Sequence, residues 1–194
     1  MRLLFVLCLF LSIPMMAQQP LPFESIPPYP KETNVGSVLA RMVHGLGYRY
    51  HWASLDLREE DLNYRPSPQG ASSYETLEHI YDLVEIVATT VEGNPTPRPS
   101  STIPNTYPAL REQTLQMLEA VGASLVEKGN EEIEAMEIVF LRDNKRFTFP
   151  IWHLINGPLS DAIYHTGQLV SFRRTTGNPI AKGVNVFIGK TKSE

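Results

Sequence analysis

Four stretches of the chain carry apolar residues at a spacing near 3.6, and this pattern limits the fold more than any other feature of the sequence. Each stretch also begins or ends at a recognisable helix signal, so we predict helices over residues 34–55, 73–92, 108–127 and 158–176. The apolar side of the first comprises Val35, Val38, Leu39, Met42, Leu46 and Ala53. Helices of this kind bury their apolar faces against one another. The pattern therefore predicts one all-α domain, a four-helix bundle, over residues 34–180.

Local chemistry sets the boundaries of these helices. Ser72 and Glu75 have the spacing of a capping box, which predicts the start of the second helix. The Pro- and Ser-rich connection over residues 94–108 is long for a bundle, and long loops in compact domains are often functional, so we expect it to border a cleft. Pro158 removes a helical hydrogen bond and clashes with the preceding turn. The Gly157–Pro158 pair therefore predicts a kink or a new helix start.

A small β-hairpin is expected between the third and fourth helices. Residues 136–149 have the composition of two strands, with Asp143-Asn144 between them as a turn. A two-residue turn at this point pairs Phe140 with Phe147, and residue 138 with residue 149, on one face of the hairpin.

The N-terminal residues are typical of a secretory signal peptide. Arg2 precedes an apolar run over residues 3–13, and the small residue Ala17 offers a cleavage site, so residues 1–17 are predicted to be removed and the protein to be periplasmic or secreted. Cleavage also removes Cys8, the only cysteine, so the mature chain has no internal disulfide. Residues 18–33 contain the five prolines of a predicted extended tether that lies apart from the core. Residues 181–194 are expected to form a short, loosely held tail.

Charge and hydropathy narrow the range of partners. The formal net charge of −4 becomes about −5 without Arg2, and the chain has no basic tract, so nucleic acid is not an expected partner. The run over residues 3–13 is too short to span a bilayer permanently, so no stable membrane insertion is expected after cleavage. The sequence identifies no small-molecule substrate or ligand, and it leaves a homodimer open.

Three polar residues on the last predicted helix have the spacing of a helical metal site. Asp161, His165 and Gln168 are four and three residues apart, which places them on one face of an α-helix. A carboxylate and an imidazole at this spacing can bind the same cation, provided that another helix supplies a third ligand. The alternative is that these residues form a solvated helix face, although Phe172 lies on the same side.

The other histidines are weaker candidates. His44 and His51 lie roughly opposite the apolar stripe of the first helix, and we expect both to be exposed to solvent. His153 lies before the Gly157–Pro158 break, so its direction cannot be inferred and we leave it out of the site. His79 lies on the rim of the apolar stripe of the second helix and therefore faces a neighbouring helix.

The segments TLEHIYDLVE and DAIYHTGQLVSFRRTTGNP, together with the order of elements, resemble the DinB-like (damage-inducible) family of metal-binding four-helix bundles. The likeness covers residues 34–179. The family pattern has a histidine on the second helix and an H-x-x-x-H-x-G-Q-like motif on the last helix. His79 matches the first of these, His165 matches the second histidine of the motif, and Gly167-Gln168 match the pair that follows it.

The resemblance implies that His79, Asp161 and His165 bind a divalent transition metal such as zinc, nickel or iron. Asp161 replaces a histidine found in many relatives, which lowers the charge of the site by one and should make the metal a weaker Lewis acid. Gln168, Tyr164 and Asp82 are candidates to accept the second N–H of a ligating imidazole.

Several functions are compatible with such a site. Some family members are metal-dependent thiol transferases or thiol-dependent isomerases, but cytosolic thiols are not available to an exported protein in comparable form. Hydrolysis of a small molecule by a metal-activated water needs no cosubstrate, so we prefer a metal-dependent hydrolase. The alternatives are a non-catalytic metal- or ligand-binding bundle and a structural protein.

Overall fold

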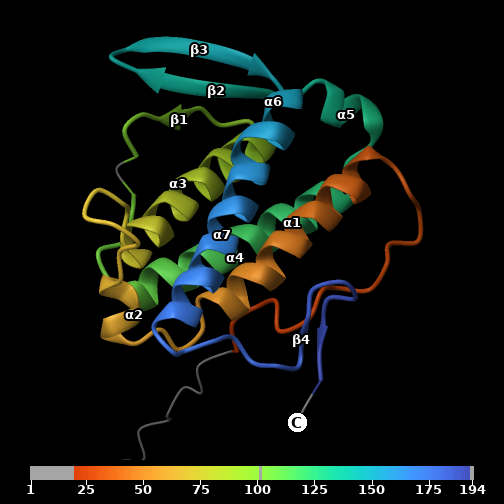
Figure 1. The fold of residues 1–194 in the computed structure, drawn as a ribbon. Coiled ribbons are helices and arrows are strands. Elements are labelled where there is room, and N and C mark those ends of the chain that lie inside the picture. Colours follow the sequence, from red (N-terminus) through yellow and green to blue (C-terminus); the bar gives the residue numbers. More distant parts are fainter. Residues whose placement is uncertain (1–19, 101, 193–194) are drawn as a thin grey trace, which may run out of the picture.

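The computed structural model of the protein describes residues 20–100 and 102–192, so the predicted signal peptide lies outside the described residues. The fold is mainly helical with a small sheet, as predicted (Figure 1). The long helices are α1 (Val35–Ala53), α3 (Ser73–Glu92), α4 (Tyr107–Val126) and α7 (Ser160–Thr175). The short helical elements are α2 (Glu59–Asn63), α5 (Asn130–Glu134), α6 (Trp152–Leu154) and the π-helical turn η1 (Ile155–Leu159). Within the described ranges, no helix combines the length and the apolar character needed to cross a bilayer.

The four long helices pack in the spatial order α1, α4, α3, α7, with α7 also against α1. Helix α1 runs antiparallel to α4, because Gly36 at its start lies against the last turn of α4 and Tyr50 near its end lies against Thr114. Helices α3 and α4 run in the same direction, so the long connection between them returns the chain along the bundle (Figure 1). Side chains such as Leu46, Ile80 and Leu118 are fully buried at the centre. Burial of each such side chain stabilises the fold by about 1.5–3 kcal/mol.

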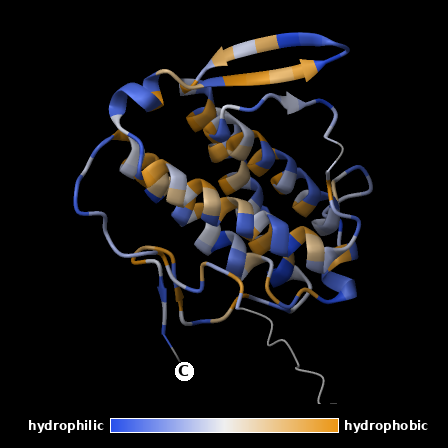
Figure 2. Ribbon diagram, turned by 180° about the vertical axis from the view of Figure 1, so that it is seen from behind, coloured by the Kyte–Doolittle hydropathy of each residue, from blue (hydrophilic) through white to orange (hydrophobic). Residues whose placement is uncertain are grey.

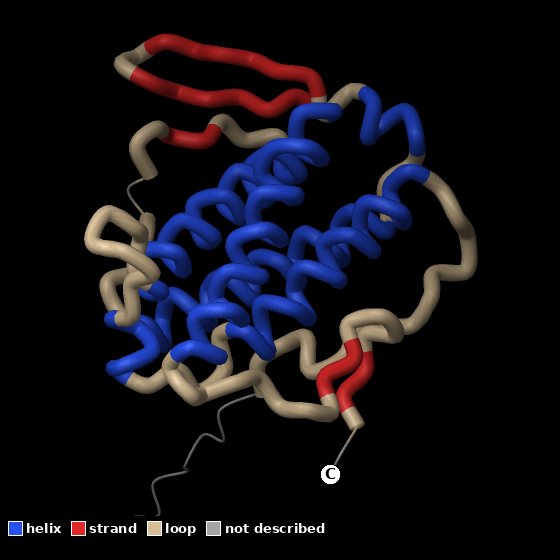
Figure 3. Tube along the Cα trace, in the orientation of Figure 1, coloured by secondary structure: helices blue, strands red, loops and turns tan. Residues whose placement is uncertain are grey.

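The strands lie outside the helices (Figure 3). One sheet has the order β1-β2-β3 and the other pairs β4 with β5. Their bounds are β1 (Thr96–Pro97), β2 (Glu137–Arg142), β3 (Lys145–Pro150), β4 (Val184–Asn185) and β5 (Lys190–Thr191).

The predicted hairpin is formed by β2 and β3. Phe140 pairs with Phe147, and residue 138 pairs with residue 149, as the turn chemistry predicts. Asp143 and Asn144 have φ values of 51° and 59°, which the two-residue turn requires and which Asp and Asn tolerate. Strand β1 was not predicted; it comes from the long connection and pairs in parallel with β2.

The helix boundaries follow the predicted signals closely. Ser72 and Glu75 exchange the two hydrogen bonds of a capping box, at 2.8 and 3.1 Å. Gly93 ends α3 in the left-handed conformation, with φ of 74°. Gly157 has non-helical backbone angles of −91° and −109°, so the Gly157–Pro158 pair is a kink within η1, just before α7 begins. The short helices α2 and α5 lie outside the four predicted helices and were not predicted.

The prediction that His44 and His51 are exposed is wrong. Their exposed fractions are 8% and 4%, and burial lowers the pKa of both imidazoles. His44 lies against Gly122 of α4, and the Nδ1 atom of His51 lies 2.7 Å from the carbonyl oxygen of Pro22. The N-terminal segment covers this side of α1 through Phe23, which is buried in the core. The prediction that residues 18–33 form a tether apart from the core is therefore wrong, because Phe23 is part of the core.

Two further expectations are also wrong. Val35 and Val38 are 44% and 51% exposed, whereas Leu39 and Ala40 of the same turns are buried, so the side of α1 that carries the two valines faces outward. The tail after residue 180 is held in place, since the backbone N–H of Ile26 donates to Gly189 O at 2.8 Å. Tyr48 also forms a hydrogen bond with Thr191, at 2.8 Å.

Candidate metal centre

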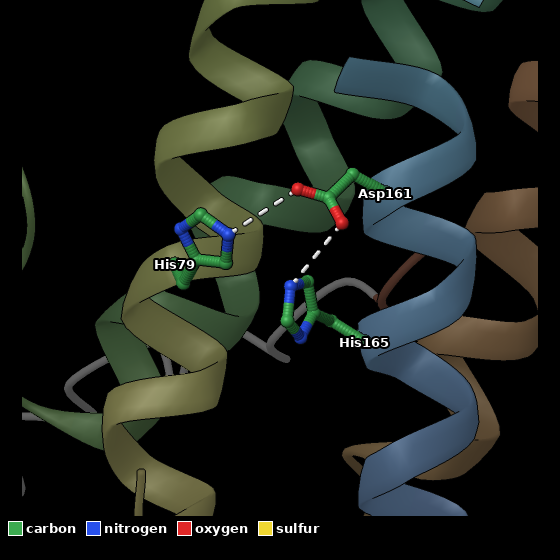
Figure 4. A group of neighbouring side chains, drawn as sticks. All are labelled: His79, Asp161 and His165. Atoms are coloured by element: carbon green, nitrogen blue, oxygen red, sulfur yellow. Dashed lines mark ion pairs between the residues drawn. The ribbon is translucent and has the colours of Figure 1, made fainter. Parts of the chain in front are cut away.

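His79, Asp161 and His165 point into the space between α3 and α7 (Figure 4). His79 follows the capping box of α3 by one turn, which fixes the start of that helix and so the direction of His79. Asp161 and His165 lie one turn apart on α7, directly after the kink. Because α3 and α7 pack side by side, one histidine comes from one helix and a carboxylate and a histidine from the other.

The carboxylate of Asp161 lies between the two imidazoles. Its Oδ2 atom is 3.5 Å from His79 Nε2, and its Oδ1 atom is 3.3 Å from His165 Nε2 (Figure 4). One ligand atom from each residue lies within 4.8 Å of the other two. Both N···O distances exceed the usual 2.7–3.2 Å of an N–H···O hydrogen bond. The three side chains therefore converge without closing on one another.

Gln168 orients the imidazole of His165. The Nδ1 atom of His165 lies 2.8 Å from Gln168 Oε1, and this amide oxygen can only accept a hydrogen bond. Nδ1 therefore carries the proton, and in the neutral ring Nε2 presents a lone pair toward the carboxylate of Asp161. Two electron-pair donors that face each other repel unless a proton or a cation lies between them. The donor set thus fits a divalent cation.

The site is open to solvent on one side. The side chains of His79 and Asp161 are 44% and 45% exposed, whereas His165 is 21% exposed. Two neutral imidazoles and one carboxylate would give a bound divalent cation a net charge of +1. Three protein ligands leave coordination positions free, and the exposure of this site would let water or a small molecule reach them.

The other two predicted supporting residues lie differently. Tyr164 is 63% exposed and packs its ring edge against His165, with 5.3 Å between the ring centres. Asp82 forms an ion pair with Arg98 from the long connection, so its position is explained without either histidine. Of the three candidates, only Gln168 forms a hydrogen bond with an imidazole of the cluster, that of His165, in the part of the chain that the structure describes.

The remaining histidines stay apart from this cluster. His44 and His51 are covered by the N-terminal segment, and His153 is exposed beside Phe149.

Sequence reasoning missed Arg98, which pairs with Asp82 and borders a cavity under the hairpin. The signal for this cavity was the length of the 94–108 connection, and the expectation that this connection borders a cleft is confirmed.

No family model, curated protein or solved structure matches the chain. The geometry of the cluster and the chemistry of its residues therefore carry the functional argument.

Proposed function

We propose that the protein is an exported, DinB-like four-helix bundle that binds one divalent transition-metal ion through His79, Asp161 and His165. The convergence of three ligand atoms within 4.8 Å, from two helices, carries this proposal. The order of the long helices and the positions of the ligands on α3 and α7 support the likeness to that family.

The ligand set favours zinc, nickel or iron over magnesium or calcium. Imidazole suits the transition metals, whereas magnesium and calcium prefer oxygen ligands throughout. The hydrogen bond from His165 to Gln168 is the kind of contact that fixes the tautomer of a metal-ligating histidine. Asp161, placed between the imidazoles, would supply the charge that holds the ion.

Hydrolysis of a small molecule is the reaction that we propose for this site. A divalent ion held by His79, Asp161 and His165 would supply Lewis acidity and would make water more acidic. The protein contributes an exposed pair of ligands, His79 and Asp161, beside which a substrate can approach. This reaction requires no cosubstrate, which suits an exported protein.

Metal binding is tested on mature protein purified without a metal-chelating tag and then treated with a chelator. We expect titration calorimetry to give one site for zinc or nickel. We expect His79→Ala, Asp161→Ala and His165→Ala each to weaken binding by at least about 100-fold, because each removes a direct ligand. His153→Ala is the control, since His153 is exposed and lies outside the cluster. If Asp161→Ala binds metal as tightly as the wild type, Asp161 is not a ligand.

A second experiment separates catalysis from binding. Loaded protein is assayed against ester, amide and phosphoester substrates, with Asp161→His as a variant that restores three histidines and should retain the metal. We expect metal-dependent turnover whose rate differs between the wild type and Asp161→His. Full metal occupancy without turnover of any substrate class would identify a non-catalytic metal-binding protein.

Export is tested separately, by N-terminal sequencing of protein purified from the native host. We expect the mature chain to start near Gln18.

A further inference from the structure

A cavity of about 540 Å³ lies between the β2–β3 hairpin and the connection that follows β1. It is lined by Arg98, Pro99, Phe140, Arg142, Phe147 and Phe149. Its volume falls within the range of small-molecule sites, which is roughly 300–1,000 Å³. The residues of the metal cluster do not line it.

The walls of this cavity are aromatic and poorly covered. Phe147 and Phe149 are 45% and 40% exposed, although both are large apolar side chains. Phe140 lies beside Phe149, with 5.8 Å between the ring centres, and pairs across the hairpin with Phe147. Hydrophobic residues run along the hairpin outside the helices (Figure 2). Three phenylalanines therefore present ring surface to the cavity, and two of them, Phe147 and Phe149, are largely exposed.

The charge around the cavity is positive. Arg98 and Arg142 line it, and none of the acidic side chains that the structure describes does. The guanidinium carbon of Arg98 lies 5.3 Å from the centre of the Phe140 ring, and Asp82 holds it from the side of α3. Its Nη2 atom is buried without a hydrogen-bond partner among the described residues, so this donor is not open to a ligand, and Arg98 acts on the cavity through its charge. Arg142 is 73% exposed, and its nearest carboxylate, Asp143, is 3.8 Å away.

We propose that this cavity binds a small aromatic carboxylate. The ring of the ligand would stack on the phenylalanines, and its carboxylate would accept hydrogen bonds from the exposed guanidinium of Arg142, beside the positive charge of Arg98. Guanidinium groups bind carboxylates through paired N–H donors, and aromatic rings pack well on one another. An uncharged aromatic ligand would contact the phenylalanines but leave the positive charge of the arginines without a partner. An aliphatic anion would pair with the arginines but leave the phenylalanines exposed. The proposal does not depend on the metal site.

The test uses 2-naphthoate as the probe and 2-naphthamide as its uncharged counterpart. Binding to the full mature chain is measured by titration calorimetry after treatment with a chelator, so failure of the metal proposal does not affect the result. We expect one site for 2-naphthoate and binding of 2-naphthamide weaker by at least about tenfold, because the amide lacks the charge. Equal affinity for the two probes, or no binding of 2-naphthoate at millimolar concentrations, would overturn the proposal.

Variants locate the site. We expect Phe147→Ala and Arg142→Gln each to weaken binding of 2-naphthoate by about tenfold, through lost ring contact and lost charge respectively. Arg146→Gln is the matched control, because Arg146 lies on the same hairpin, carries the same charge and borders a different hollow. Phe187→Ala controls for loss of an exposed ring, since Phe187 is 94% exposed and lies on the β4–β5 turn. If the two controls weaken binding as much as the test variants, the probe does not bind in this cavity.

Discussion

Replacement of Asp61 by Asn is expected to lower the stability of the protein strongly. Asp61 lies on α2 with an exposed fraction of 1%, and it accepts five hydrogen bonds. Three come from Arg58, at 2.8 to 2.9 Å, and the others come from Thr176 and Asn178 at the end of α7. The side chain therefore joins α2 to the end of the helix that carries Asp161. Asparagine would retain the shape but place an NH₂ donor among donors.

The magnitude follows from the burial of this charge. Arg58 is 48% exposed, so the variant leaves no buried unpaired charge, and the cost comes from the weakened hydrogen bonds to the buried carboxylate, about 1.5–3 kcal/mol. For a chain of this size each kcal/mol changes Tm by about 2–4 °C, so we expect a decrease in Tm of roughly 3–12 °C at pH 7. Glu60→Gln is the control, because Glu60 lies on the same helix and contacts Arg58 at 3.8 Å but is 69% exposed. We expect that control to change Tm by less than about 2 °C.

The pH dependence of the stability difference between the wild type and Asp61→Asn gives a second test of the role of Asp61. Hydrogen bonds, first from Arg58 and then from Thr176 and Asn178, hold the pKa of Asp61 well below its ordinary range, although burial opposes them. A group whose folded-state pKa is depressed stabilises the fold above its unfolded pKa of about 3.9, and this contribution is lost as the pH falls toward the folded-state pKa. Urea unfolding at pH 7, 5 and 3.5 should show a difference between wild type and Asp61→Asn that is constant at first and then decreases. A difference below about 1 kcal/mol at pH 7, or one that increases on acidification, would refute the argument.

Two further substitutions test the packing and the site. Gly122→Ala would place a Cβ atom 2.5 Å from His44 Nε2, so we expect a loss of about 1–3 kcal/mol in urea unfolding, whereas Gly167→Ala meets nothing within 4 Å and should be neutral or stabilising. If both variants behave alike, overlap with His44 does not control stability at this position. Gln168→Ala removes the acceptor of the His165 Nδ1–H, so we expect metal affinity to fall by about 10–100-fold in calorimetry with an unchanged fold. Unchanged affinity would show that Gln168 does not orient the ligand.

The parts of the fold that the sequence predicts well are those set by nearby residues. The hairpin register follows from the Asp143-Asn144 turn, because a two-residue turn fixes which residues face each other. The start of α3 follows from Ser72 and Glu75, which bond to each other across one turn. Such features need no knowledge of the rest of the chain.

The burial of His44 and His51 depends on a segment that has no periodic pattern. A helical projection distinguishes the apolar side of α1 from the side that carries His44 and His51. It does not show that Phe23 and its neighbours cover the side with the histidines. The many prolines of this segment were consistent with an extended chain, and an extended chain can lie along a helix as well as away from it. Which of these occurs is decided by tertiary contacts such as the one between His51 and Pro22.

The candidate site also has one part that local geometry predicts and another that tertiary packing decides. Asp161 and His165 share a face of α7 through their spacing alone, so this half of the cluster was predictable from local geometry. The approach of His79 depends on how α3 and α7 pack, which the family resemblance indicated and the structure displays. The pairing of Asp82 with Arg98 depends on the path of an irregular connection, and no sequence pattern specified it.

Because of the kink at Gly157, the orientation of α7 does not depend on the orientation of the hairpin that precedes it. The non-helical angles of this residue interrupt the rotation that a continuous helix would transmit along the chain. The directions of Asp161 and His165 are therefore set by the packing of α7 against α1 and α3. An insertion of one residue in the hairpin turn would leave both side chains aimed at His79. The same insertion between Asp161 and His165 would turn one of them by about 100° and separate the pair.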